Sequence, residues 1–285
     1  MAKGMREIKR QIKSTQNTKQ ITRAMEMVAA ANLRRAQQSA ESARPYAEKL
    51  KEVVGSIAAG TKGVNHPMLE TRAVKKTGYL VITSDRGLAG GYNANVLRKV
   101  VAEIREKHKS TDEYTIFVIG RKGRDFFKKR NMPITEEVTG VPDLPSFADI
   151  KSIAYAAVSN FEKGAYDQLF LVYNQFKNAM TQIPTIKRLL PLDDVSGTTV
   201  SAYEYEPSPE GVLEVLLPKY AETLIYSAVL EGKASEFGAR MSAMNSATKN
   251  ATKMISTYTL AYNRARQASI TQEISEIVAG ANASS

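Results

Sequence analysis

The chain ends in a stretch, residues 208–285, that opens with SPEG and closes with ITQEISEIVAGANASS. Ser208 can cap the first turn of a helix, and Pro209 fits the first helical position because an N–H would have no partner there. Pro218 is the only proline that follows, and no helix stop signal occurs before Gly280. The sequence therefore predicts one helix of about 70 residues, which would be roughly 100 Å long.

Apolar and small residues recur along this stretch at alternating steps of four and three, which is the spacing of a coiled-coil seam. The positions are Leu230, Ala234, Phe237, Met241, Met244, Thr248, Ala251, Ile255, Tyr258, Tyr262, Ala265, Ser269 and Gln272. A helix of this length and pattern needs a second long helix as its partner.

The N-terminal segment, residues 5–60, is the other region that can form a long helix. It is rich in helix-forming residues, and its one proline, Pro45, should bend the helix rather than necessarily end it. A thin apolar stripe, suited to a two-helix seam, follows Ile8, Ile12, Thr15, Ile21, Met25, Val28 and Asn32. We expect this helix, about 80 Å long, to pair in antiparallel fashion with the C-terminal one.

Between the two long helices, short apolar strands alternate with helices. The strands are expected at residues 79–83, 114–120, 168–173 and 183–190, and the helices at residues 93–107, 122–130 and 147–161. Continuous apolar strands separated by helices predict a mostly parallel sheet covered on both faces. The predicted fold class is α/β with a long antiparallel coiled coil. A Rossmann-like α/β foot domain, residues 63–207, is inserted in a discontinuous shaft, residues 1–62 and 208–285.

If the two helices pair, the C-terminal one should extend past the start of the other by roughly 15 to 20 residues, or about 25 Å. This overhang carries Ile270, Ile274, Ile277 and Val278 at helical spacing, and we expect no partner for them inside the chain. An apolar stripe of this kind predicts a binding site for it on another protein.

Composition narrows the possible functions. The chain has 43% hydrophobic and 24% charged residues, no cysteine, and two histidines, His66 and His108, far apart in the sequence. We therefore expect no disulfide, no thiolate metal site and no histidine-based metal cluster or catalytic triad. The sequence predicts neither a membrane span nor a signal peptide, since charged helix follows Met5 directly.

The net charge of +11 is concentrated at the N-terminus. Residues 1–62 carry 13 Lys+Arg against 5 Asp+Glu, residues 63–207 carry 20 against 17, and residues 208–285 carry 7 against 7. Such a basic face can be simply solvated, or it can bind an acidic protein or nucleic acid. Because no aromatic residues are interleaved with the basic ones, we expect no base-specific recognition and leave nonspecific nucleic-acid binding as an alternative.

The most enzyme-like passage is the turn SDRGLAGG, residues 84–91, between a predicted strand and a predicted helix. Turns at this place hold phosphates in α/β folds, but neither G-x-G-x-x-G nor G-x-x-x-x-G-K-[ST] occurs. We interpret it as a tight turn that needs glycine, with Asp85 and Arg86 as a local ion pair. A nucleotide-binding α/β enzyme and a basic coiled-coil nucleic-acid-binding protein are the alternative functions.

Three separated motifs together resemble one known family. The motif ITQEISEIVAGA, residues 270–281, is similar to the family signature I/V-T-x-E, two residues, D/E, three residues, G-A at every constrained position. QNTKQITRAMEMV at residues 16–28 and SDRGLAG at residues 84–90 are also similar to that family. These motifs resemble the gamma subunit of F-type ATP synthase. The resemblance is to the bacterial form, since the sequence has neither the cysteine-bearing chloroplast insertion nor a mitochondrial transit peptide.

The resemblance implies a central rotor shaft that has no catalytic residue, cofactor or metal of its own. In that family the coiled coil lies inside a hexamer of three alpha and three beta subunits. The α/β domain sits with the epsilon subunit on the membrane c ring, and ion flow turns ring and shaft. The implied location is the cytoplasmic face of the bacterial cell membrane, where the protein is peripheral and attached only through the Fo sector, with no nucleic-acid partner.

The family pattern also assigns contacts to particular residues. The implied contacts with the catalytic subunits are Arg23 and Met25, which face an acidic lever segment of beta, and Arg266, Gln267, Ile270, Thr271, Ile274 and Ile277. The implied contacts of the foot with the c ring and epsilon are Tyr205 and Glu206. The basic N-terminal helix agrees with an acidic lever, and the apolar overhang agrees with a protein binding site.

Overall fold

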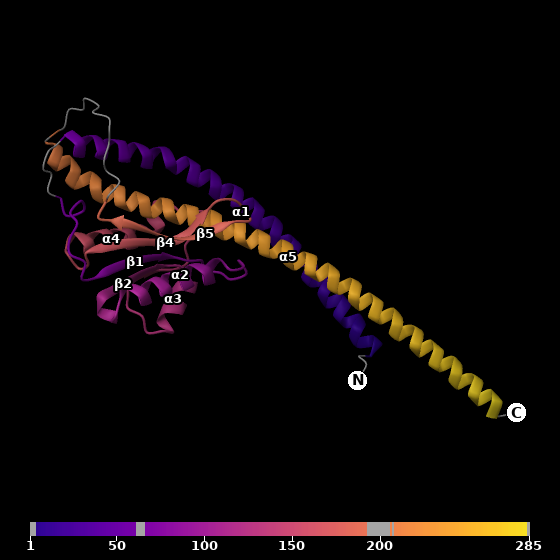
Figure 1. The fold of residues 1–285 in the computed structure, drawn as a ribbon. Coiled ribbons are helices and arrows are strands. Elements are labelled where there is room, and N and C mark those ends of the chain that lie inside the picture. The colour runs from indigo at the N-terminus through magenta and orange to yellow at the C-terminus, as the bar shows by residue number, and fades with distance from the viewer. Residues whose placement is uncertain (1–3, 61–65, 193–205, 207, 284–285) are drawn as a thin grey trace. The chain divides into compact units, whose positions relative to one another are not determined.

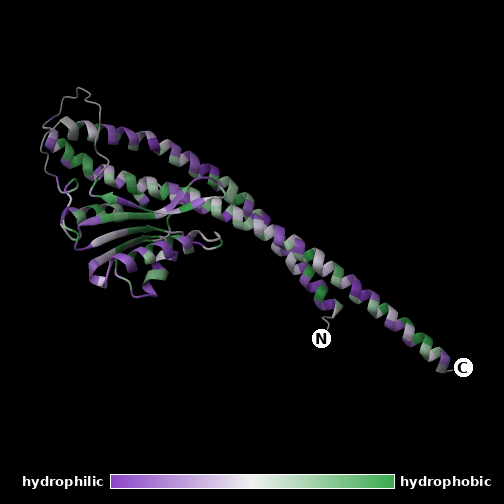
Figure 2. Ribbon diagram, in the orientation of Figure 1, coloured by the Kyte–Doolittle hydropathy of each residue, from purple (hydrophilic) through white to green (hydrophobic). Residues whose placement is uncertain are grey.

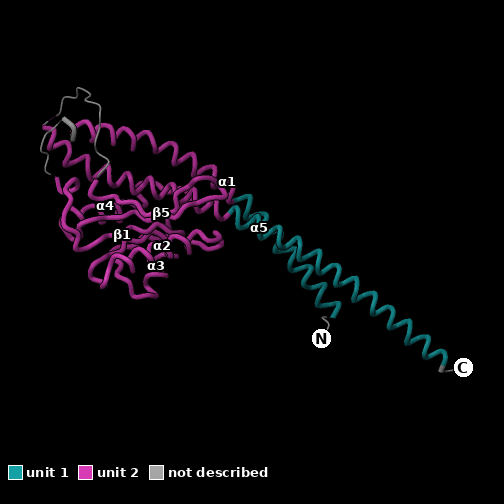
Figure 3. The backbone as a smooth tube through the Cα atoms, viewed as in Figure 1, with its two compact units in different colours: residues 1–28, 241–285 teal, residues 29–240 magenta. Residues whose placement is uncertain are grey.

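The computed structural model describes residues 4–60, 66–192, 206 and 208–283. Contacts group the chain into two compact units, residues 1–28 with 241–285 and residues 29–240 (Figure 3). Two long helices, α1 (Met5–Gly60) and α5 (Pro209–Ala283), contribute to both units (Figure 1). The two long helices predicted from the sequence are thus confirmed.

The start of α5 agrees with the sequence signals, but its end does not. The Ser208 hydroxyl accepts a hydrogen bond from the Gly211 N–H at 3.2 Å, so the predicted N-cap is confirmed. The helix continues past Gly280 to Ala283. Pro45 and Pro218 both lie inside helices, so neither proline ends its helix.

The unit formed by residues 29–240 contains a five-stranded sheet with the strand order β3-β2-β1-β4-β5. The strands are β1 (Thr77–Ile82), β2 (Tyr114–Ile119), β3 (Ile134–Val138), β4 (Gln168–Phe176) and β5 (Gln182–Leu190). All neighbouring strands run parallel except β4 and β5, which form an antiparallel hairpin. The predicted, mostly parallel α/β fold is confirmed, although β3 was not predicted from the sequence.

Helices cover both faces of this sheet. On one face, α2 (Tyr92–Lys107) and α3 (Arg121–Lys128) pack on alternate residues of β1 and β2, such as Val81 and Val118. On the other face, α4 (Lys151–Glu162) and parts of α1 and α5 pack on Leu80 and Phe117. The helix expected at residues 147–161 begins instead as a short 3-10 turn, Phe147–Asp149, before α4.

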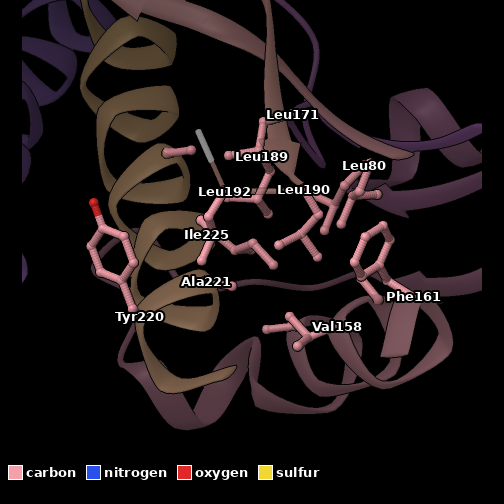
Figure 4. Packing of buried hydrophobic residues seen from close by; sticks show 14 of the residues in the cluster. Leu80, Val158, Phe161, Leu171, Leu189, Leu190, Leu192, Tyr220, Ala221 and Ile225 are labelled. Atoms are coloured by element: carbon pink, nitrogen blue, oxygen red, sulfur yellow. The ribbon is translucent and has the colours of Figure 1, made fainter. Parts of the chain in front are cut away.

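The largest hydrophobic core joins the sheet to the long helices. Figure 4 shows Ala221 and Ile225 of α5 close to the β5 residues Leu189 and Leu190, and all four side chains are buried. Leu50, Val54 and Ile57 of α1 belong to the same core. These segments of α1 and α5 are therefore part of the α/β unit, and the compact units do not coincide with the domain boundaries drawn from the sequence. Whether residues 63–207 form a separate domain stays a prediction.

The unit formed by residues 1–28 and 241–285 is an antiparallel helix pair (Figure 3). On α5, four-three spacing links the less exposed positions Met244, Thr248, Ala251, Ile255, Tyr258, Tyr262, Ala265 and Ser269. All of these residues are predicted seam positions. Gln272, the predicted position nearest the C-terminus, is exposed. The coiled-coil seam of α5 is thus confirmed in this unit.

The seam on α1 differs from the predicted stripe. It runs through Ile8, Ile12, Thr15, Lys19, Thr22 and Glu26. The predicted stripe was wrong from Ile21 onward by one residue: Ile21 is 60% exposed and Val28 61%, whereas Thr22 is 9% exposed. At this point of the seam the two helices meet through short hydroxyl side chains, since the Thr22 hydroxyl bonds that of Thr248.

Candidate functional site

The C-terminal part of α5 extends beyond the start of α1 within the helix pair. Facing residues are identified by two hydrogen bonds, Thr22 with Thr248 and Asn245 with Glu26, both 2.8 Å long. The numbers in these pairs add to 270 and 271, so Met5, the first residue of α1, lies opposite a residue near 265. All residues from 271 to 282 are exposed. The predicted overhang is therefore present.

The overhang presents apolar side chains on one face. The exposed fractions are 46% for Ile270, 56% for Ile274, 72% for Ile277 and 53% for Val278. Figure 2 shows hydrophobic and hydrophilic residues interleaved along this end of α5. Large aliphatic side chains at this spacing and exposure form a stripe suited to burial against another protein.

The polar residues assigned to this region are also exposed. The side chains of Arg266 and Gln267 reach solvent, and so does Thr271. The Thr271 hydroxyl donates its proton to the Gln267 carbonyl at 2.9 Å, which leaves its oxygen able only to accept from a partner. The structure thus brings these three residues together on two turns of one helix, and their contact roles stay predictions.

Arg23 and Met25, the residues assigned on α1, lie beside the seam. The Arg23 guanidinium lies 3.3 Å from a Glu26 oxygen, with 60% of the Arg23 side chain exposed. The other Glu26 oxygen accepts a hydrogen bond from Asn245. Met25 is partly buried. Arg23 is therefore held near α5 through Glu26, while its charge still faces solvent.

Of the two residues assigned to the foot, the structure describes one. Tyr205 lies outside the described residues. Glu206 is described and exposed. Their contacts with a c ring or an epsilon subunit stay predictions.

Side chains of residues 83 and 85, at the turn of residues 84–91, bond backbone N–H groups at the start of α3 and at Val141. One Asp85 oxygen accepts a hydrogen bond from the Arg121 N–H at the start of α3, at 2.9 Å, and the other accepts from the Val141 N–H at 3.0 Å. The Thr83 hydroxyl oxygen accepts from the Gly123 N–H at 2.9 Å. Side chains of the chain itself thus occupy backbone N–H groups at the N-terminus of α3, one of the two helix ends beside this turn.

This arrangement corrects one prediction and supports another. In the described part of the chain, Asp85 forms no ion pair with Arg86, because its two oxygens are directed at backbone N–H groups. The turn does need the conformational freedom of glycine, since Gly90 has a φ of 56° in the left-handed region. The geometry favours a structural turn over a nucleotide site.

Breaking this cap should cost stability. We expect Asp85→Ala to lower the free energy of unfolding by about 2 to 4 kcal/mol, because two N–H groups lose a charged acceptor. Asp112→Ala, at an exposed position before β2, is the control and should change it by less than about 0.5 kcal/mol. Urea unfolding of the full chain measures both. Equal effects of the two substitutions would show that Asp85 is not a structural anchor.

A buried charged cluster, missed from the sequence, holds α5 beside this turn. The Glu236 carboxylate is 4% exposed and lies 2.7 Å from Arg240 and 3.7 Å from Lys233. Lys233 also donates to the Val141 carbonyl at 3.2 Å, and Arg240 donates to the Gly87 carbonyl at 3.3 Å. The signal available in the sequence was the placement of three charges on one face of an otherwise apolar part of the helix.

Neutral polar groups extend the attachment of α5 to the sheet. Burial raises the pKa of Tyr92, and the nearby Glu236 carboxylate raises it further. The phenol therefore stays protonated and donates to the Gly232 carbonyl at 2.9 Å. The Ser235 hydroxyl donates to the Asn174 carbonyl at 2.7 Å. These bonds fix α5 against the start of α2 and against β4.

The cavity next to the charged cluster has a volume of about 350 Å³. Its charged lining residues are Asp85, Arg86, Arg121, Asp143, Lys233 and Glu236. Three acidic and three basic side chains balance one another, so the lining does not select an anion such as a nucleotide phosphate. The two histidines lie elsewhere: His66 accepts from the Met68 N–H at 3.2 Å, and His108 bonds the Tyr79 hydroxyl at 2.9 Å.

The residues that the structure describes contain no group of three or more His, Cys, Asp or Glu side chains that could hold a metal ion. Across the same residues, none of the helices combines the length and the apolar character needed to cross a membrane.

Known proteins identify the family. The family model described as ATP synthase matches residues 4–283. The ATP synthase gamma chain of Brevibacillus brevis is 68% identical over 285 residues, which cover 99% of each chain. This chain belongs to the ATP synthase gamma chain family. The resemblance to the bacterial gamma subunit is confirmed, and the gamma chain is the non-catalytic central-shaft subunit of the synthase.

Solved structures of mitochondrial ATP synthases share the gamma chain fold. A chain in the central stalk and c-ring structure from Tetrahymena thermophila matches with a TM-score of 0.62 and 27% identity, covering 80% of this chain and 99% of that one. Euglena gracilis rotor and F1/c-ring structures match with TM-scores of 0.65 and 0.69, each at 19% identity, covering 93% and 98% of this chain and 98% and 94% of theirs. The Euglena matches support the fold alone.

Proposed function

We propose that this gamma chain turns inside a hexamer of alpha and beta subunits and carries the rotation of a membrane c ring to the catalytic sites. The observation that carries the proposal is the overhang of α5, where Ile270, Ile274 and Ile277 are exposed on a helix that α1 does not reach. An exposed apolar stripe marks a protein-binding surface, and the central cavity of an alpha/beta hexamer would enclose the helix and bury this stripe.

Subunit counting tests this proposal. The chain is co-expressed with the alpha and beta subunits of a bacterial synthase and purified through a tag on beta. We expect a complex of one gamma, three alpha and three beta chains. A chain that stays outside the complex would contradict the proposal. A thermal shift with ATP, or retention on DNA with a steep salt dependence, would instead favour one of the two alternative functions.

The exposed polar residues beside the stripe should bind loops of the hexamer. We expect Arg266→Ala with Gln267→Ala to lower coupled ATP synthesis by about 10-fold or more, because each removed hydrogen bond to a partner is worth about 1 kcal/mol and those to charged groups more. Arg105→Ala with Glu106→Ala on α2 is the matched control, since both residues are exposed on the α/β unit. Unchanged ATP synthesis in the Arg266→Ala, Gln267→Ala variant would show that these two residues do not bind loops of the hexamer.

On α1, we propose that Arg23 and Met25 face an acidic lever segment of the beta subunit. The proposal is supported by the exposed Arg23 guanidinium, which Glu26 holds in place. The 13 Lys+Arg against 5 Asp+Glu in residues 1–62 provide a basic environment for such a partner.

We further propose that the α/β unit is the foot of the rotor, with Tyr205 and Glu206 among its contacts to the c ring and the epsilon subunit. The gamma chain family belongs to a membrane-associated complex. The chain would then be peripheral on the cytoplasmic face of the bacterial membrane, attached through the c ring. Membranes that lack the c subunit should lose the chain to the soluble fraction, and retention there would contradict this attachment.

A further inference from the structure

Two polar contacts join the helix pair of residues 5–28 and 241–283 across its seam. The Thr22 and Thr248 hydroxyl oxygens lie 2.8 Å apart, and Thr22 is buried. One turn further along α1, the Asn245 amide donates to the Glu26 carboxylate at 2.8 Å. The rest of the seam on either side consists largely of apolar or small side chains.

The hydrogen bond between the Thr22 and Thr248 hydroxyls forms only when the two residues face each other. The Thr22 hydroxyl also lies within bonding distance of the Lys19 carbonyl, at 3.1 Å, and the Thr248 hydroxyl lies 2.9 Å from the Met244 carbonyl. One hydroxyl can therefore donate across the seam while the other donates to its own helix. In either arrangement both protons are donated, and one hydroxyl oxygen accepts the bond across the seam.

A slide of one heptad would break both contacts at once. It would place Thr22 opposite Met241 or Ile255, and Glu26 opposite Gly238 or Thr252. In such a slide Ile12 would exchange Tyr258 for Ala251 or Ala265, and Ile255 would exchange Thr15 for Ile8 or Thr22. None of these exchanges leaves a charged group without a partner. The polar pairs distinguish the native register from its neighbours because a slide would leave their groups without partners across the seam, as a single buried polar residue does in other coiled coils.

We propose that the Thr22–Thr248 and Glu26–Asn245 pairs lock the antiparallel register of this coiled coil. The lock sets how far α5 extends beyond α1, since a slide of one heptad moves the two helices by about 10 Å relative to each other. The consequence for activity rests on the proposed rotor function: the register places the apolar stripe at the height where the hexamer would bind it.

Engineered disulfides in the full chain test the lock, because the natural sequence has no cysteine. The pair Ile12→Cys with Tyr258→Cys reports the native register, and Ile12→Cys with Ala251→Cys reports a slide of seven residues. Each pair is oxidised in the natural background and in the lock variant Thr22→Val, Thr248→Val, Asn245→Ala. We expect the ratio of native to shifted disulfide to fall by at least about tenfold in the lock variant.

The control variant Asn250→Ala, Thr252→Val, Thr257→Val makes the same changes at exposed positions of α5. It should leave the ratio unchanged, and Thr22→Ser with Thr248→Ser should restore it because the hydroxyls are kept. Valine at both seam positions leaves the pair apolar, so we expect the melting temperature to hold while the register loosens. An unchanged ratio in the lock variant would overturn the proposal, and so would loss of both disulfides, which would show that the pairs hold the helices together rather than in register.

This experiment separates the lock from the rotor function. The disulfide ratio is measured on the chain without alpha or beta subunits, so a negative result overturns the lock alone. Failure of the chain to co-purify with the hexamer overturns the rotor function alone. If both results are positive, the lock variant should still assemble but should synthesise less ATP than the control variant.

Discussion

Ile270→Ser, Ile274→Ser and Ile277→Ser together should weaken binding of the chain to the alpha/beta hexamer by about 100-fold and leave its own melting temperature unchanged. These side chains are 46% to 72% exposed, so the isolated chain loses little when they are removed. Serine has about the same helix propensity as isoleucine, which keeps the helix itself intact. Each isoleucine should lose about 1 kcal/mol of burial against the partner, about half of what complete burial gives.

The matched control moves the same three substitutions to another face of the helix. Gln272→Ser, Glu276→Ser and Ala279→Ser have the same spacing and are also exposed. Titration of labelled hexamer with each variant gives the affinities, and circular dichroism gives the melting temperatures. A similar loss of affinity in both triple variants would mean that the stripe is not a specific binding surface. A drop in melting temperature of the first variant alone would mean that the isoleucines stabilise the chain instead.

The elements predicted well from the sequence are those whose signals are local and repeated. The Ser208 cap, the scarcity of helix breakers and the four-three spacing of α5 are each visible in the sequence, and all three correspond to observed structure. The strands β1, β2 and β4 are apolar runs buried between helices. β3 was missed because ITEEV contains two glutamates, and as an edge strand it needs only partial burial.

The seam of α1 shows where such pattern reading fails. Hydropathy alone favours Ile21 and Val28 over the neighbouring Thr22 and Ala29, yet the latter two are buried. A close helix–helix contact selects small side chains and a hydroxyl pair, and this choice depends on a partner 226 residues away in the sequence. The larger apolar residues are left on the flank of the seam, where a hydropathy pattern cannot distinguish surface from contact.

The candidate site divides in the same way. The apolar overhang could be predicted because the two helices differ in length, and that difference can be counted. The role of Asp85 could not, because its partners are the N–H groups of Arg121 and Val141, which only the fold brings close. The pairing of Lys233, Glu236 and Arg240 lies within one helix, but its burial depends on the turn that covers it.

We expect Glu236→Ala to lower the free energy of unfolding by about 3 to 5 kcal/mol, the largest stability effect among the substitutions considered. The carboxylate is 4% exposed and is paired with Lys233 and Arg240, so its removal leaves two cations close together. The Lys233 ammonium is itself buried and keeps only the Val141 carbonyl as a protein partner among those described. Desolvation of an uncompensated charge is the main cost.

A surface ion pair supplies the control for this substitution. Glu137 pairs with Lys128 at 2.8 Å, but 57% of the lysine side chain is exposed, so Glu137→Ala should cost less than about 1 kcal/mol. Urea unfolding of the full chain compares the two variants under the same salt, and Glu236→Gln should fall between them because it keeps the shape and one acceptor. If Glu236→Ala cost no more than Glu137→Ala, solvent would have to reach the charged cluster. The cluster would then not be the buried attachment that holds α5 against the carboxyl ends of the strands.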